Sequence, residues 1–159
     1  MAERDGGVVS CAAPDCHAPR DRALTARLLV VLPLLGLALR VWGFRRTHGV
    51  LDRLSAPAVK RGRGQARDPE HIAAVVVHVN RHLLPYQSRC LLESTALWYL
   101  LRRNAHAADL VLGARTLLGP FEAHAWVELD GRAMNDTGRV RDIYTPFDLP
   151  ATGTKAGTS

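Results

Sequence analysis

The chain has 159 residues, of which 47% are hydrophobic and 23% are charged, and its formal net charge is +6. This length suits one domain with a modest core, and this composition excludes a chain that is disordered over most of its length. Three cysteines without a tight framework or a preceding secretory signal point to the reducing cytoplasm.

Residues 1–19 are predicted to form a flexible tail, because they are polar and contain several glycines and prolines. Cys11, Cys16 and His17 lie in this tail. A zinc site needs a fourth ligand, and none lies nearby in the sequence. We therefore expect a reduced, metal-free pair of cysteines here.

Residues 20–67 are predicted to form an N-terminal apolar helix followed by a basic linker. The apolar run 28–39 is too short by itself to span a bilayer, and Pro33 and Gly36 should bend the helix. One interpretation is a core helix under the domain that follows. The other is a docking surface for a partner protein, or a peripheral membrane contact through residues 24–46.

The positive charge is concentrated in this half of the chain. Between Arg20 and Arg67, eleven basic residues stand against Asp21 and Asp52, a net charge of +9. The basic stretch 60–67 suits a solvated linker, or an electrostatic contact with an acidic partner or peptide. Nucleic-acid binding is not expected, because neither a recognition motif nor interleaved aromatic residues accompany the charge.

A second domain-forming region is predicted over 68–150. The sequence Asp68-Pro-Glu70 is typical of a helix start, and the helix should run to about Leu84. Three histidines fall near one face of this helix, but it lacks the adjacent glutamate of a hydrolytic zinc helix, so a solvated polar face is the favoured interpretation. These residues are His71, His78 and His82.

Cys90 lies where the next helix is predicted to begin. Pro85 ends the preceding element, and an apolar run leads from Cys90 to the cations at 102–103. The N–H groups and the positive dipole end of a helix start stabilise a thiolate and can bind an oxyanion. The alternative is a buried, inert cysteine.

Two strands are predicted over 110–115 and 123–129, and Asp130-Gly131 indicates a hairpin to a returning strand. Alternation along the second strand puts three side chains on one face: His124, Trp126 and Glu128. His124 is therefore either a base for Cys90 or a structural histidine.

The partner of His124 depends on the hairpin register, because a slip of one residue exchanges the two faces of a strand. A two-residue loop would place Asn135 on the face of His124, whereas a three-residue loop would place Asp136 there. Both residue types can orient an imidazole, and only the carboxylate also stabilises an imidazolium. Asp136 is favoured and Asn135 remains the alternative.

Together these stretches resemble the lasso-peptide maturation B protein, and more narrowly its leader-peptidase part, a branch of the transglutaminase-like cysteine protease superfamily. The resemblance is close over about 68–140 and loose upstream. It rests on three stretches: Pro85-Tyr-Gln-Ser-Arg-Cys-Leu-Leu-Glu-Ser-Thr-Ala-Leu97, Leu110-Val-Leu-Gly-Ala-Arg115 and Ala123-His-Ala-Trp-Val-Glu-Leu-Asp-Gly131.

The resemblance implies an α+β, papain/transglutaminase-like fold, with N-terminal helices packed on a small antiparallel sheet. It also implies a cysteine endopeptidase that removes the leader from a ribosomally made precursor, with Cys90 as nucleophile, His124 as base and Asp136 as orienter. Gln87 and Trp126 are secondary candidates for supporting the oxyanion.

The implied partners are the precursor peptide and an asparagine-synthetase-like cyclase, which uses ATP, while the peptidase itself needs no cofactor or metal. A separate leader-recognition protein is expected, because the roughly 67 residues upstream of the peptidase-like part show no alternating strands. The chain is therefore expected to be the split form of the family. Two other functions stay open: acyl transfer to an amine, and a non-catalytic scaffold that presents the precursor.

After Asp136 the pattern weakens. Residues 142–148 are expected to add an edge strand or to cover the site, and residues 151–159 are expected to form a tail.

Overall fold

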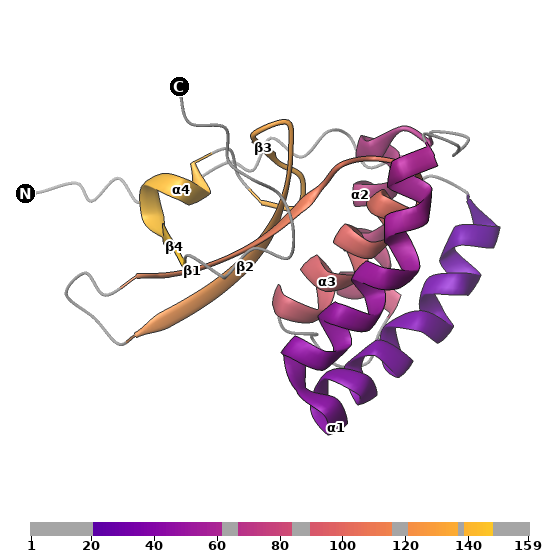
Figure 1. The fold of residues 1–159 in the computed structure, drawn as a ribbon, viewed down its shortest axis with the longest axis horizontal. Helices are drawn as coiled ribbons and strands as arrows, with labels where there is room; N and C mark the ends of the chain where they lie inside the picture. Colours follow the sequence, from indigo (N-terminus) through magenta and orange to yellow (C-terminus); the bar gives the residue numbers. More distant parts are fainter. Residues whose placement is uncertain (1–20, 62–66, 84–89, 116–120, 137–138, 148–159) are drawn as a thin grey trace, which may run out of the picture.

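The computed structural model describes residues 21–61, 67–83, 90–115, 121–136 and 139–147, which form an α+β fold with the long helices gathered beside a small sheet (Figure 1). The predicted fold class is therefore confirmed. In chain order the elements are α1 (Arg22–Arg61), α2 (Pro69–His78), the π-helix η1 (Val79–Leu83), α3 (Cys90–Arg103), β1 (Asp109–Arg115), β2 (Glu122–Leu129), β3 (Arg132–Ala133), α4 (Val140–Ile143) and β4 (Thr145–Pro146).

The sheet has four antiparallel strands in the order β3-β2-β1-β4. In the long β1–β2 ladder, Gly113 lies directly opposite His124. The strand β4 pairs with the outer side of β1, so the expected edge strand within 142–148 is present. This arrangement brings the C-terminal part of the described chain back to the level of His124.

The core lies between the helices and one face of β2. Val127 belongs to the same buried cluster as residues of α1, α2 and α3, and it is fully buried. The cluster also contains Leu28 and Leu32 of α1, Ile72 of α2, and Leu97 and Leu101 of α3, each at most 1% exposed. The apolar face that alternation predicted for β2 is therefore the face that packs on the helices.

α1 is bent into two helical legs that run back alongside each other (Figure 1). The backbone leaves helical geometry at Gly43, where φ is +75°, a conformation that glycine adopts without a Cβ penalty. The bend is thus not at Pro33 and Gly36, where it was predicted. Pro33 is exposed inside the first leg, so the hydrogen bond that its ring removes lies on the solvent side.

One face of the first leg is buried in the core, as a core helix requires, through Leu24, Leu28, Leu32 and Leu35. The opposite face is exposed although it is also apolar. The helix extends well beyond the run 28–39, and by length and composition alone it could cross a membrane. The run 28–39 by itself remains too short for a span, and only the longer helix reaches the necessary length.

Candidate active site

Cys90 is the first residue of α3, in agreement with the predicted helix start, and its thiol is free and half-buried. The first N–H groups of a helix have no partner within it, and they carry the positive end of the helix dipole. Cys90 is thus placed beside N–H groups that can bind an anion. Gln87 and Pro85 lie outside the described residues, as do Cys11 and Cys16.

His124 and Asp136 form a hydrogen-bonded pair through the imidazole Nε2 and the carboxylate Oδ2. Both side chains are about a quarter exposed, so the pair is shielded from water but reachable from the surface. Because Nε2 is engaged with Asp136, the second ring nitrogen, Nδ1, is the one that can exchange a proton. It has no hydrogen-bond partner among the described residues.

A hydrogen bond ties the start of α3 to the strand that carries His124. The Ser94 hydroxyl, one turn after Cys90, donates to the Ala125 carbonyl over 2.8 Å. Ala125 follows His124 directly, so the thiol and the imidazole belong to two segments that are joined at this point. Within the described part of the chain, no hydrogen bond links the Cys90 thiol to His124 itself.

The hairpin register differs from the one that the sequence linked to Asp136. Leu129 pairs with Arg132, so the loop is Asp130-Gly131 and has two residues. Asp136 nevertheless reaches His124, because the β2–β3 ladder ends after Ala133. The prediction that the returning strand continues to Asp136 was wrong. The alternation of side chains between the two faces of a strand therefore does not decide where Asp136 points.

Asn135 explains how the chain leaves the ladder. Its Oδ1 accepts the Val127 N–H over 2.9 Å, in the place where a strand carbonyl would otherwise lie. Its Nδ2 donates to Ser94 Oγ over 2.9 Å and to Glu93 Oε1 over 3.3 Å. Asn135 therefore connects the sheet to α3 instead of pairing with His124.

Glu93 is a buried carboxylate in the first turn of α3, three residues after Cys90, and it is 7% exposed. Its Oε2 accepts a hydrogen bond of 2.6 Å from Asn80 Nδ2, which comes from the π-helix η1. This network was not predicted from the sequence. The signal was the consecutive polar residues Glu93, Ser94 and Thr95 within an otherwise apolar helix, since buried polar groups need partners.

Tyr144 covers His124. The two rings stack with centroids 4.8 Å apart, and the Tyr144 hydroxyl donates to Glu122 Oε1 over 3.0 Å. Arg115 lies over the Tyr144 ring, with its guanidinium 5.6 Å from the centroid, and also pairs with Glu122. Burial and the Glu122 carboxylate raise the pKa of Tyr144, so the ring covers the imidazole as a neutral phenol. The expected cover from residues 142–148 thus includes this ring.

Trp126 is completely buried on the same strand as His124, and its ring stacks at 6.2 Å from the imidazole. Its indole N–H donates to Glu128 Oε1 over 2.7 Å. Arg141 of α4 donates twice to the same carboxylate, over 2.7 and 2.6 Å. The Arg141 hydrogen bond is the largest of the contributions that lower the pKa of Glu128. The Trp126 N–H therefore binds the same carboxylate that holds α4 on the sheet through Arg141.

The histidines of the second helix lie apart from this constellation. His78 is in α2 and His82 in η1, and their rings are 4.9 Å apart. In the part of the chain that the structure describes, no group of three or more His, Cys, Asp or Glu side chains is arranged to hold a metal ion.

A cysteine at the start of a helix, and a histidine–carboxylate pair on the antiparallel sheet to which that helix is hydrogen-bonded, are features of the transglutaminase type. The sequence profile of the transglutaminase-like superfamily matches residues 31–147, and the chain belongs to this superfamily.

Over 61 residues the chain is 43% identical to the Escherichia coli "Microcin J25-processing protein McjB". The aligned part is 38% of this chain but only 28% of that relative's length. This similarity and the superfamily match confirm the resemblance to the lasso-peptide maturation B proteins. No solved structure matches the chain significantly.

Proposed function

We propose that this chain is a cytoplasmic cysteine endopeptidase that removes the leader from a lasso-peptide precursor. The superfamily and the similarity to McjB support processing of such peptides in general. The observation that carries the finer proposal is the His124–Asp136 pair, on a strand tied to the start of α3 by the Ser94–Ala125 hydrogen bond. A cytoplasmic location suits a reaction that needs Cys90 as a reduced thiol.

In the proposed first step, Nδ1 of His124 takes the proton of the Cys90 thiol, and the sulfur attacks the carbonyl carbon at the end of the leader. The carbonyl oxygen becomes an oxyanion, which the backbone N–H of Cys90 stabilises, with Gln87 as a further candidate donor. Asp136 holds the imidazole in orientation and stabilises the imidazolium. The C–N bond then breaks, and His124 returns the proton to the leaving amine of the core peptide.

In the second step, His124 takes a proton from water, and the resulting hydroxide attacks the thioester carbonyl. The C–S bond breaks, the leader departs with a free carboxyl end, and the thiolate recovers the proton. This route needs neither metal nor cofactor. A separate leader-recognition protein would deliver the precursor, and an ATP-using cyclase would take up the released core peptide.

The test is cleavage of the precursor by the full chain with its leader-recognition partner, followed by mass spectrometry. Cys90→Ala should abolish cleavage while leaving complex formation intact. The matched control is Cys11→Ser combined with Cys16→Ser, which should cleave at the normal rate. Unchanged cleavage by Cys90→Ala would overturn the proposal, and a leader that ends in an amide would identify acyl transfer to an amine instead.

The carboxylate is tested separately with Asp136→Asn. An amide cannot stabilise the imidazolium, and it can hold the ring in the wrong tautomer, so we expect a loss of up to about 10⁴-fold in rate. Asp130→Asn at the hairpin turn makes the same chemical change away from His124 and should leave the rate unaltered.

A further inference from the structure

The bend of α1 exposes an apolar surface that the proposed peptidase chemistry does not use. Val41 is 64% exposed and Trp42 is 59% exposed, both immediately before Gly43. Leu34 and Leu37, earlier on the same leg, are 60% and 57% exposed. Large apolar side chains gathered in this way on a soluble domain mark an interaction site.

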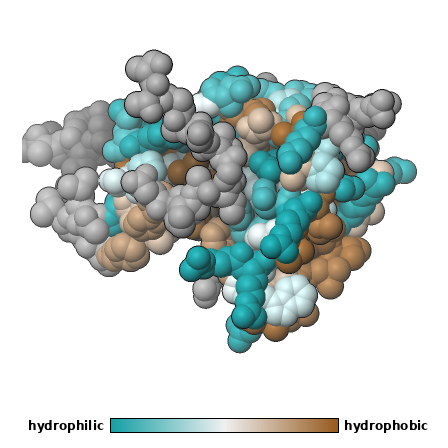
Figure 2. Space-filling view, in the orientation of Figure 1, coloured by the Kyte–Doolittle hydropathy of each residue, from teal (hydrophilic) through white to brown (hydrophobic). Residues whose placement is uncertain are grey.

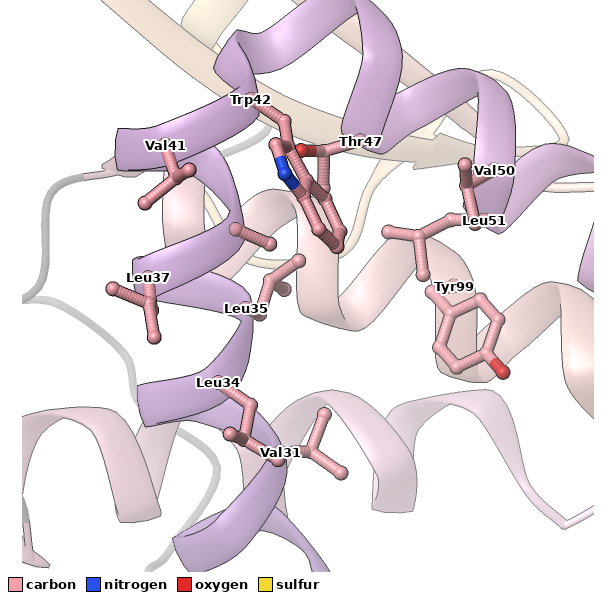
Figure 3. Close-up of a pocket in the computed structure, with 11 residues that line it drawn as sticks. Val31, Leu34, Leu35, Leu37, Val41, Trp42, Thr47, Val50, Leu51 and Tyr99 are labelled. Carbon is pink, nitrogen blue, oxygen red and sulfur yellow. The ribbon is translucent and has the colours of Figure 1, made fainter.

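These side chains border a groove of about 540 Å³ between the two legs of α1. Figure 3 shows side chains of the first leg, such as Leu34, and of the second leg, such as Leu51, around a common space with Tyr99 of α3 at one side. The lining is almost entirely apolar, so a partner must supply apolar groups to fill it.

The same helix carries a strong positive charge. Between Arg22 and Arg61 there are eight basic residues and one acidic residue, Asp52, which is paired with Arg102. Arg40, Arg45 and Arg46 flank the bend and are exposed. Figure 2 shows hydrophilic side chains bordering the apolar surface on this side of the molecule. The natural partner therefore combines negative charge with an apolar interior.

α1 cannot cross a bilayer in this fold, although its length and composition would permit it. The face formed by Leu24, Leu28, Leu32 and Leu35 is buried against the rest of the domain. A span would require removing this face from the core. The helix is thus suited to lying on a membrane surface with only its outer face in contact.

We propose that the bent α1 docks this protein on an anionic phospholipid surface. Val41 and Trp42 enter the boundary between headgroups and acyl chains, a position that tryptophan favours, and the arginines beside the bend contact lipid phosphates. A second copy of the chain is a poorer occupant, because face-to-face pairing would bring the two sets of arginines together.

The experiment uses the full chain with vesicles of phosphatidylcholine alone or mixed with phosphatidylglycerol, and it measures sedimentation and tryptophan emission. Trp98 and Trp126 are 3% and 0% exposed, so Trp42 is the tryptophan that reports on the surface. We expect binding to the anionic vesicles only, a blue shift on binding, and weakening as salt screens the charges.

Two variants separate the apolar and charged contributions. Val41→Glu keeps the reporter and should abolish the blue shift, and Arg45→Ala with Arg46→Ala should weaken binding by about tenfold or more. Both sites are exposed, so we expect both variants to fold normally, and circular dichroism measures their helix content. The charge-matched control is Arg132→Ala with Arg139→Ala, whose side chains are 77% and 86% exposed on other elements, and it should bind normally.

Three results would overturn the proposal: no binding to anionic vesicles, equal binding to neutral vesicles, or a dimer in solution that Val41→Glu dissociates. The last result would assign the surface to a second copy. None of these readouts depends on peptide cleavage, so the docking proposal and the peptidase proposal can fail independently.

Discussion

The side chain of Asn135 bridges the sheet and α3, with its Nδ2 2.9 Å from Ser94 Oγ. Its Oδ1 simultaneously accepts the Val127 N–H, which ends the β2–β3 ladder. The next residue, Asp136, pairs with His124, and Ser94 lies one turn beyond Cys90. The Asn135 amide therefore holds α3, which carries Cys90, against β2. It also sets where the adjacent Asp136 lies relative to that strand.

Asn135→Ala should lower both the stability and the proposed peptidase activity. The change leaves the Val127 N–H unpaired and removes a donor from Glu93 and Ser94, so we expect a loss of about 2–3 kcal/mol in the free energy of unfolding. Urea denaturation measures the stability, and single-turnover cleavage measures the rate.

The matched control is Asn104→Ala, which removes one hydrogen bond, from Asn104 Nδ2 to the Leu100 carbonyl, at the other end of α3. We expect about 1 kcal/mol of destabilisation and an unchanged rate per folded molecule. If Asn135→Ala also left that rate unchanged, Asn135 would be structural only and would have no role in positioning Asp136.

The contacts of Asn135 could not be predicted from the sequence, although the elements on either side of them could. The hairpin at Asp130-Gly131 and the start of α3 at Cys90 were predictable, because both depend on local turn and helix signals. The route of Asp136 to His124 was not, because it depends on a side chain replacing a backbone acceptor after Ala133. The bend at Gly43 was also not predicted, because a single glycine within a helical pattern does not indicate a left-handed backbone conformation.

Gly113 is predicted to be intolerant of a side chain. A Cβ at this position would lie 2.9 Å from atoms of the Trp126 ring and 2.9 Å from the Thr145 carbonyl oxygen. Gly113→Ala should therefore displace the ring or the edge strand, at a cost of about 1–3 kcal/mol. Because Gly113 lies opposite His124, the rate of cleavage should fall as well.

Thermal unfolding and the near-ultraviolet dichroism of the tryptophans measure the effect of Gly113→Ala. Gly49→Ala is the control, because it lies in the second leg of α1 with no atom within 4 Å of its Cβ position. Alanine in that helix should be neutral or stabilising by up to about 1 kcal/mol. Equal stabilities of the two variants would contradict the tight approach at Gly113.

Glu128 should make the protein sensitive to acid. Its pKa in the folded protein lies below the ordinary value of 4.5, chiefly because Arg141 donates hydrogen bonds to the carboxylate. The unfolded chain therefore binds this proton more readily than the folded protein. The stabilisation is fully present above about pH 4.5 and is lost as the pH falls below that value.

Glu128→Gln should therefore cost about 2 kcal/mol at pH 7 and flatten the decline of stability below pH 4.5, as measured by denaturation across pH 3 to 7. Glu70→Gln is the control, because Glu70 is 56% exposed and its distance to Arg132 is 3.7 Å. An identical acid profile in wild type and Glu128→Gln would show that the Arg141 contact is not held in solution.

Ala105 occupies a backbone conformation that favours glycine, and its replacement should stabilise the protein. Its φ is +67° directly after α3, where the Ala105 N–H donates to the Arg102 carbonyl and the His106 N–H donates to the Leu101 carbonyl. These two bonds form a Schellman motif, in which a Cβ is strained. The linker after α3 contains no glycine, so the sequence carries no local signal for this motif. Ala105→Gly should raise the free energy of unfolding by about 1 kcal/mol without changing the cleavage rate, whereas Ala58→Gly within α1 should lower it by a similar amount. A loss of stability in Ala105→Gly would mean that the left-handed conformation at the end of α3 does not persist in solution.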